Sequence, residues 1–275
     1  MNIPFYKYQG TGNDFIIIDN REAIFPKKEA FIERLCHRRF GIGADGLILL
    51  ESHPSYDFEM VYYNADGRIS SMCGNGGRCI SAFAKKLGII DKVCRFLAID
   101  GPHEAVVEAA DWVELKMRDV TFGERGQDYV VLDTGSPHYI VFVEDLDDIN
   151  IVENGKAIRY SAPYKKEGIN VNFVEQTANA IEVATYERGV EDETYSCGTG
   201  VTAAAIAYYM NQPEEERTKV AVKTKGGDLE VRFLSDGKEG VKEVWLCGKA
   251  NLVFAGELES RGFIFSSVRT GNITS

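Results

Sequence analysis

Two copies of a Cys-Gly-x-Gly segment, one in each half of the chain, constrain its fold more than any other feature. They lie in Met72-Cys73-Gly74-Asn75-Gly76-Gly77-Arg78-Cys79 and in Ser196-Cys197-Gly198-Thr199-Gly200. Each runs into apolar residues at helical spacing, which predicts a cysteine at a helix entrance. Unpaired N–H groups and the helix dipole at such an entrance bind an anion and lower the pKa of a thiol. The pair therefore predicts a single cleft lined by two matched thiols.

Most of the remaining sequence predicts short strands, rich in Val, Ile, Phe and Tyr and separated by Gly, Asp, Asn and Pro. A third helix is predicted over Lys27–Arg39, where Phe31, Leu35 and Cys36 share one face. The predicted strands are Ile3–Gln9, Phe15–Asn20, Leu47–Ser52, Phe58–Asn64, Cys94–Ile99, Glu104–Glu108, Trp112–Met117, Tyr129–Thr134, Tyr139–Val143, Asn170–Gln176, Ile181–Thr185, Lys219–Lys223, Leu229–Phe233, Glu243–Leu246 and Leu252–Glu257.

Each half is thus a run of strands with one internal, largely apolar helix, which must be covered on most sides. We expect two halves that are each a curved sheet wrapped around a central helix. The polar stretch 121–128 marks the boundary, giving domains 1–120 with Cys73 and 121–262 with Cys197. The C-terminal segment 263–275, with the apolar run Gly262–Val268, is expected to return to the first domain. Glu144–Asp148 and Asn211–Arg217 are predicted acidic surface loops.

Charge and cysteine content exclude several classes of protein. A formal net charge of −11 argues against nucleic acid or an anionic membrane as a partner. The N-terminal residues predict no secretory signal, and no apolar run approaches the length of a membrane span. Six cysteines in 275 residues predict reduced thiols rather than a disulfide framework. We expect a cytoplasmic protein.

Neither a metal nor a cofactor is predicted. Gly41–Gly46 matches G-x-G-x-x-G, but a predicted helix precedes it and a strand follows it, the reverse of a dinucleotide site. Gly198-x-Gly200-x-x-Ala203 opens a helix but follows polar residues instead of a buried strand. The spacing from Cys73 to Cys79 lacks a histidine pair and is a poor zinc signal. Buried positions are expected for the other cysteines, namely Cys36, Cys79, Cys94 and Cys247.

Several polar residues at strand ends allow both a structural and a functional interpretation. Asn13, Asn64 and Asn170 suit turns as well as a ligand site. Glu187 and Arg188 suit a solvated ion pair, and His138 suits a structural role or the support of a site.

Taken together, these segments resemble the diaminopimelate epimerase family, cofactor-independent enzymes that interconvert LL- and meso-diaminopimelate. The resemblance covers the whole chain in order and is most specific in the C-G-N-G-x-R-C block. It rests on Gly10–Phe15, Tyr63–Gly67, Met72–Cys79, Gly135–His138, Asn170–Val171, Glu187–Gly189 and Ser196–Gly200.

The resemblance implies an α/β (α+β) protein of two similar domains, each a curved mixed sheet wrapped around a central helix, with the active site in the cleft between them. It also implies a role for each matching residue. Cys73 and Cys197 would be the acid and base on opposite faces of the α-carbon. The carboxylate at the reacting centre would be held by Gly74, Asn75, Gly198 and Thr199, with Asn13 nearby. The distal, non-reacting amino acid end would be held by Asn64, Asn170, Glu187 and Arg188.

Three departures from the family pattern bear on substrate choice. Ser136 stands where the family usually has Asn, Gly46 replaces a frequent Gln, and the loop from Arg188 to Cys197 is one residue longer. A racemase for another amino acid therefore stays open, as do a thiol redox protein and an anion-binding protein. Redox proteins usually keep their two thiols close in sequence, as C-x-x-C. The expected partner is a small diamino dicarboxylic acid. The sequence does not specify the oligomeric state and is compatible with a homodimer.

Overall fold

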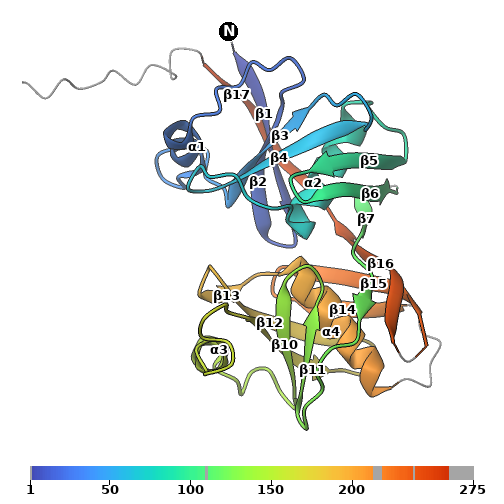
Figure 1. Cartoon of the computed structure of the whole chain (residues 1–275). Helices are drawn as coiled ribbons and strands as arrows, with labels where there is room; N and C mark the ends of the chain where they lie inside the picture. Colours follow the sequence, from blue (N-terminus) through green and yellow to red (C-terminus); the bar gives the residue numbers. More distant parts are fainter. Residues whose placement is uncertain (1, 109–110, 213–218, 238, 260–275) are drawn as a thin grey trace, which may run out of the picture.

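The protein consists of two lobes of strands, each wrapped around a helix (Figure 1). The computed structural model describes residues 2–108, 111–212, 219–237 and 239–259. The first lobe contains β1 (Ile3–Gly10), β2 (Asn13–Asp19), α1 (Glu29–Cys36), β3 (Gly46–Glu51), β4 (Phe58–Asn64), α2 (Gly74–Lys86), β5 (Val93–Ala98), β6 (Gly101–Val107) and β7 (Trp112–Lys116). There follow β8 (Val120–Thr121), β9 (Tyr129–Asp133), β10 (Pro137–Val143), α3 (Ile151–Arg159), β11 (Asn170–Gln176), β12 (Ile181–Glu187), β13 (Asp192–Thr194), α4 (Gly198–Asn211), β14 (Lys219–Thr224), β15 (Gly227–Ser235), β16 (Gly240–Lys249) and β17 (Asn251–Leu258).

Both lobes repeat one order of strands. In the first lobe, β1–β2 is antiparallel, β2–β3 parallel, β3–β4 antiparallel, β4–β5 parallel, and β5–β6–β7 antiparallel. The second lobe repeats this with β9–β10, β10–β11, β11–β12, β12–β14 and β14–β15–β16. Parallel neighbours need a crossover connection. A helix lies in each crossover, α1 and α2 in the first lobe and α3 and α4 in the second. The two Cys-Gly-x-Gly segments therefore occupy equivalent places.

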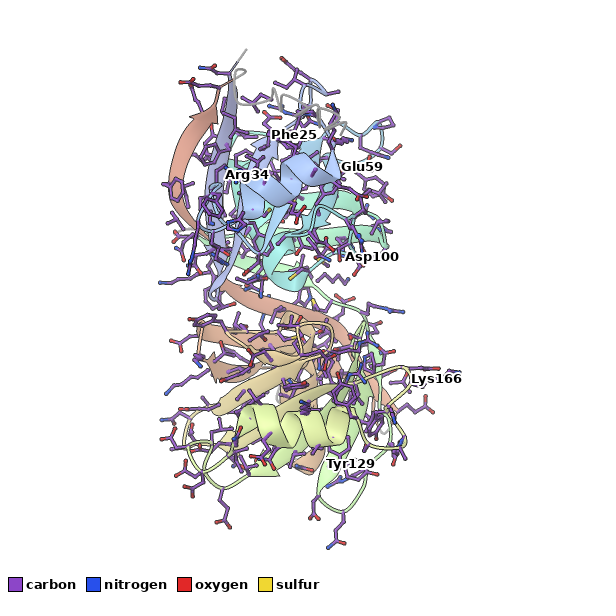
Figure 2. The ribbon with its side chains drawn as sticks, turned by 90° about the vertical axis from the view of Figure 1, so that its left-hand side faces the viewer. Phe25, Arg34, Glu59, Asp100, Tyr129 and Lys166 are labelled. Carbon is purple, nitrogen blue, oxygen red and sulfur yellow. The ribbon has the colours of Figure 1, made fainter. Side chains whose placement is uncertain are left out.

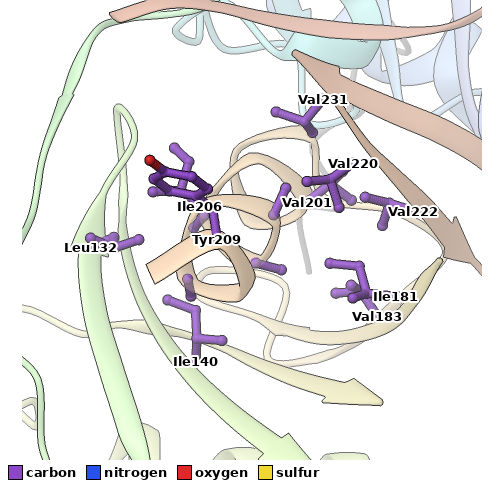
Figure 3. Close-up of a cluster of buried hydrophobic side chains, with 14 of the residues drawn as sticks. Leu132, Ile140, Ile181, Val183, Val201, Ile206, Tyr209, Val220, Val222 and Val231 are labelled. Atoms are coloured by element: carbon purple, nitrogen blue, oxygen red, sulfur yellow. The ribbon is translucent and has the colours of Figure 1, made fainter. Parts of the chain in front are cut away.

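The central helix of each lobe forms the middle of its hydrophobic core. α4 is apolar on nearly every side, and strands surround it, so the prediction of a covered apolar helix is confirmed. Figure 3 shows this core, in which Val201, Ile206 and Tyr209 of α4 face the strand residues Leu132, Ile140, Ile181, Val183, Val220, Val222 and Val231. In the first lobe, Cys79, Ile80 and Phe83 of α2 pack into the corresponding core.

A shorter helix covers the outer face of each sheet. Phe31, Ile32 and Leu35 of α1 pack on the first sheet, and Ile151 and Ile158 of α3 pack on the second. Figure 2 shows α1 and α3 on the same side of the molecule, as the repeat requires. Both lobes are therefore built in the same layers, with the central helix inside and the short helix outside. Among the described residues, no helix is long and apolar enough to cross a membrane.

Two segments cross between the lobes side by side. β7 pairs with β16 from Trp112 to Lys116, and only Ala250 separates β16 from β17. β17 then pairs with β1 in the first lobe. Residues 251–258, which the sequence assigned to the second domain, thus complete the hydrogen bonding of β1, which would otherwise have an unpaired edge. We propose that the two domains divide between β7 and β8.

Most of the predicted elements are present. Every strand expected within the described residues is confirmed, with ends that differ by at most three residues, whereas the predicted return segments, Gly262–Val268 and 263–275, lie outside the described residues. Glu144–Asp148 is an irregular loop as expected, and Asn211–Arg217 falls partly outside the described residues. The helix expected over Lys27–Arg39 is shorter, because beyond Cys36 the His37 ring accepts the N–H groups of Arg39 and Phe40 in a turn. α3 was not predicted.

Candidate active site

The entrances of the two central helices meet between the lobes. Cys73 and Cys197 are the N-cap residues of α2 and α4, both with extended backbone and without a side-chain cap. A Cβ added at Gly198 would lie 3.5 Å from the Gly74 Cα and 3.0 Å from Leu246. Only glycine lets the two entrances approach this closely. The free N–H groups of both helices thus converge on one region, as the sequence predicted.

Cys73 is partly exposed and lies beside Asn13. Its Sγ is 3.5 Å from the Asn13 Oδ1, within reach of an S–H donor. Burial raises the pKa of the Cys73 thiol, while hydrogen bonds from the backbone N–H groups of Gly76 and Asn75 act in the opposite direction. The predicted lowering of the thiol pKa is therefore wrong. The helix N–H groups act as expected, but the loss of solvation outweighs them.

Cys197 is more deeply buried, at 9% exposure. Burial raises the pKa of its thiol to about 12, and the negative charge of Glu187 adds to that effect. The N–H group of Gly200 opposes it, and the Cys73 sulfur contributes to raising it. The two sulfurs therefore interact electrostatically, although 124 residues separate them in the sequence. Both shifts favour the protonated thiol at neutral pH.

A row of amides joins Cys73 to the second lobe. Asn75 Nδ2 donates to the Ser196 carbonyl at 3.0 Å and lies 3.4 Å from the Asn13 Oδ1. The Asn75 Oδ1 accepts from Arg78 Nη2 at 3.0 Å, and the Thr11 hydroxyl lies 3.4 Å away. Asn75 thus bridges the two lobes through the residue that precedes Cys197.

Asp45 fixes which way the Asn13 amide points. Asn13 Nδ2 donates to the Asp45 Oδ2 at 2.7 Å, so the Asn13 Oδ1 must face Cys73. Arg38 holds Asp45 and Asp14 together, with 2.7 Å between its Nη2 and each carboxylate. Lys7 pairs with Asp14 from the other side, at 2.7 Å. The sequence analysis missed this cluster, although Asp45 lies within the rejected G-x-G-x-x-G segment.

A second row of polar groups leads away from Cys197. The Cys197 Sγ is 3.4 Å from the Thr199 Oγ1, which lies 2.9 Å from the His138 Nε2. The His138 Nδ1 lies 2.8 Å from the Asn172 Oδ1, and Asn172 Nδ2 donates to the Thr185 hydroxyl at 2.7 Å.

The directions of these hydrogen bonds follow from the end of the row. The Asn172 amino group donates to Thr185, so the Asn172 Oδ1 faces His138 and accepts a hydrogen bond from its Nδ1–H. The His138 Nε2 then accepts a hydrogen bond from the Thr199 hydroxyl, so a lone pair of the Thr199 oxygen faces Cys197. Burial lowers the pKa of His138 to about 4, so this neutral form is stable. His138 therefore holds the Thr199 hydroxyl in place beside Cys197, whereas the sequence left open whether this histidine has a structural role or supports a site.

Part of the residue set predicted to hold the distal end also converges. Asn170 Nδ2 donates to the Ser136 hydroxyl at 2.8 Å, and the Asn170 Oδ1 accepts from the Arg188 backbone N–H at 2.9 Å. Arg188 donates to the Ser136 hydroxyl at 3.3 Å and to the Glu167 carbonyl at 3.0 Å. The Ser136 hydroxyl thus accepts from both Asn170 and Arg188, although a serine here departs from the family pattern.

Glu187 and Asn64 take no part in these hydrogen bonds. The negative charge of Glu187 contributes to raising the pKa of both the Cys73 and the Cys197 thiols. Burial raises the pKa of Glu187. Asn64 is exposed at the end of β4, where its backbone closes a turn with Gly67 and Arg68.

Gly46, the second departure from the family pattern, has a structural reason. A Cβ at this position would lie 2.5 Å from the Tyr62 ring and from the Tyr63 carbonyl. A glutamine side chain therefore requires these two residues to move. Across residues 2–108, 111–212, 219–237 and 239–259, no three His, Cys, Asp or Glu side chains are grouped as metal ligands would be.

Comparisons with known proteins agree with the resemblance seen in the sequence. The family model described as diaminopimelate epimerase matches residues 5–122 and 130–253, one segment in each half. A diaminopimelate epimerase of Flavobacterium psychrophilum is 51% identical over 254 residues, covering 92% of this chain and 98% of the relative. That of Chlorobaculum tepidum is 42% identical over 259 residues, covering 90% and 98%.

Solved structures show the same fold at low sequence identity. A phenazine biosynthesis protein of the PhzF family from Bacillus anthracis superposes with a TM-score of 0.72 at 14% identity, covering 94% of this chain and 99% of that one. A hydroxyproline epimerase from Agrobacterium vitis gives a TM-score of 0.68 at 14% identity, covering 97% and 96%.

Proposed function

This chain belongs to the diaminopimelate epimerase family of isomerases, and from that premise we propose that it interconverts LL- and meso-diaminopimelate through Cys73 and Cys197. The observation that carries the proposal is the meeting of two equivalent helix entrances, each with a cysteine at its N-cap. Inverting an α-carbon needs a base on one face and an acid on the other. Two thiols from opposite lobes fulfil that requirement without a cofactor.

The helix N–H groups stabilise the charge that develops during the reaction. A substrate carboxylate between the two entrances accepts from the N–H groups of both helices and carries the negative charge that builds up as the α-proton leaves. One cysteine is a thiolate when the substrate binds and the other is a thiol, so the pair holds one proton. Its titration belongs to both residues together.

The distal end of the substrate binds where Ser136, Asn170 and Arg188 converge. The Arg188 guanidinium can hold a carboxylate by two parallel hydrogen bonds. Glu187, with its charge felt by both thiols, faces an ammonium group of the substrate. A substrate with only one amino acid end leaves Arg188 unoccupied, which favours a diamino diacid over ordinary amino acids. We further propose that the enzyme acts in the cytoplasm on this small molecule, without nucleic acid or membrane as a partner.

The experiment follows the hydrogen at the inverted carbon. One pure stereoisomer of diaminopimelate is converted in heavy water, beside a panel of ordinary amino acids. We expect only diaminopimelate to react, and its first product molecules to carry deuterium while the remaining substrate stays unlabelled. Cys73→Ala and Cys197→Ala should each abolish conversion and retain the fold. Early product that keeps the original hydrogen would contradict the two-thiol mechanism. Faster conversion of another amino acid would assign a different racemase activity.

A further inference from the structure

Arg78 is a buried cation without a matching anion. Its side chain is 0% exposed, although arginine is almost never fully buried unless it is paired. In the part of the chain that the structure describes, no carboxylate lies within ion-pair distance of it. The titratable groups that face it are all thiols, Cys73 and Cys79 on the same helix and Cys247 on β16. Burial raises the pKa of each of these thiols, which disfavours a thiolate that would compensate the charge of Arg78.

The Arg78 guanidinium contacts the first turn of α2. Nη1 donates to the Gly74 carbonyl at 3.4 Å, and Nη2 donates to the Asn75 Oδ1 at 3.0 Å and to the Thr11 hydroxyl at 3.2 Å. Because Asn75 gives its oxygen to Arg78, its amino group is turned toward Asn13 and the carbonyl before Cys197.

Two glycines leave room for this group. A Cβ at Gly10 would lie 3.3 Å from the Arg78 Nη2, and one at Gly248 would lie 3.5 Å from its Nε. The Nε itself is buried without a hydrogen-bond partner. Burying an unpaired charge is costly. A protein stabilised only by packing would do better with an apolar residue here, so the charge points to a role in the site.

We propose that Arg78 is a positioning residue that supplies the permanent positive charge for the site, and that its counter-charge is the negative charge formed there during reaction. That charge is a Cys73 thiolate or a carboxylate between the helix entrances. The second part of the role is to orient the Asn75 amide across the two lobes. The proposal rests on the proposed epimerase function, because only proton transfer through Cys73 requires such an anion.

The test measures the Cys73 thiolate directly, without turnover. Alkylation of Cys73 by iodoacetamide is followed by peptide mass spectrometry from pH 6 to 10 in the wild type, Arg78→Met, Arg78→Gln and Arg78→Lys. Loss of the charge should raise the pKa of the Cys73 thiol by about one, which slows alkylation about tenfold at a given pH. Arg78→Lys keeps the charge and should alkylate close to the wild-type rate. Epimerisation should fall about tenfold to a hundredfold in kcat for the two neutral variants.

Arg125→Met is the matched control. Arg125 also donates to a carbonyl and to an amide oxygen, those of Met210 and Asn211, but it is exposed. This variant should alkylate and turn over as the wild type does. Thermal denaturation of every variant separates a loss of fold from a loss of charge, and Arg78→Gln keeps an amide donor for Asn75 if Arg78→Met does not fold.

Each outcome decides the proposal. Neutral variants that fold and alkylate at the wild-type rate would overturn it. Failure of both neutral variants to fold would also overturn it, since the charge would then serve the structure. A wild type that alkylates faster than Arg78→Met but does not epimerise diaminopimelate would refute the proposed function and leave the electrostatic role of Arg78 in place.

Discussion

Replacing His138 by glutamine should remove a large part of the acid sensitivity of the fold. The His138 ring is 0% exposed, and burial lowers its pKa from the ordinary 6.5 to about 4. The unfolded chain takes up a proton below pH 6.5 that the folded chain refuses until pH 4. The stability that neutral His138 contributes is therefore complete above pH 6.5 and is lost as the pH falls toward 4. The gap between these values corresponds to about 3 kcal/mol.

The assay is urea denaturation of the wild type and His138→Gln at a series of pH values from 7 to 4. Between these limits the wild type should lose about 3 kcal/mol more of its free energy of unfolding than the variant. Comparing the two losses cancels the carboxylates, such as Asp14, that titrate in both proteins. The charges that face His138 are those of Asp133 and Arg188, and both remain in the variant. His37→Gln, an exposed histidine in a turn, is the control for loss of an imidazole.

Parallel losses in the wild type and His138→Gln would refute the reasoning. They would mean that His138 is protonated or solvated in the folded protein. The hydrogen-bond directions from Asn172 through His138 to Thr199 would then be wrong as well.

Three further predictions test other parts of the structure. Gly200→Ala would place a Cβ 2.4 Å from the Asn172 Nδ2, so the free energy of unfolding measured with denaturant should fall by about 1–3 kcal/mol. The same variant should lower kcat, because it disturbs the hydrogen bond between the His138 ring and Asn172. Arg188→Lys loses the planar guanidinium that donates to Ser136, so its KM for diaminopimelate should rise about tenfold or more. An unchanged KM would mean that Arg188 does not bind the substrate. Cys79→Ala should lower the free energy of unfolding by about 0.5–3 kcal/mol while kcat stays at the wild-type value, and a loss of turnover in a folded Cys79→Ala protein would require a further thiol in the mechanism.

The sequence was sufficient for most of the fold because its strands are short, apolar and clearly separated. It did not reveal α3, where Gly155 interrupts the helical pattern. That glycine is required because a Cβ there would lie 2.4 Å from Tyr186. The available signal was the pair Asn150 and Glu153 at the start of the helix. The Asn150 Oδ1 accepts a hydrogen bond from the Glu153 N–H, and the Asn150 Nδ2 donates to the Glu153 carboxylate. The pairing of β17 with β1 depends on sheet edges that only the folded chain defines.

For the site, the sequence predicted candidate residues but not the balance of energies that sets the pKa of the two thiols. The glycine-rich entrances predicted the N–H groups around Cys73 and Cys197. The opposing loss of solvation depends on how closely the two lobes pack, so the direction of the thiol pKa was wrong. The contributions of Arg78, Asp45 and Asn172 come from contacts between segments that lie far apart in the chain, and composition or spacing does not show them.

The pairing of β1 with β17 has a consequence for how the protein is made. Ribosomes add roughly 5–20 residues per second, and domains near the N-terminus usually fold first. About 140 residues separate the end of β7 from the end of β17, so the first lobe waits about 7 to 28 s for its last strand at those rates. During that interval one edge of β1 exposes its backbone donors and acceptors beside the apolar side chains of Ile3 and Phe5. The nascent chain is therefore most prone to aggregation before the second lobe is finished, and chaperones that bind extended apolar segments would act on this strand first.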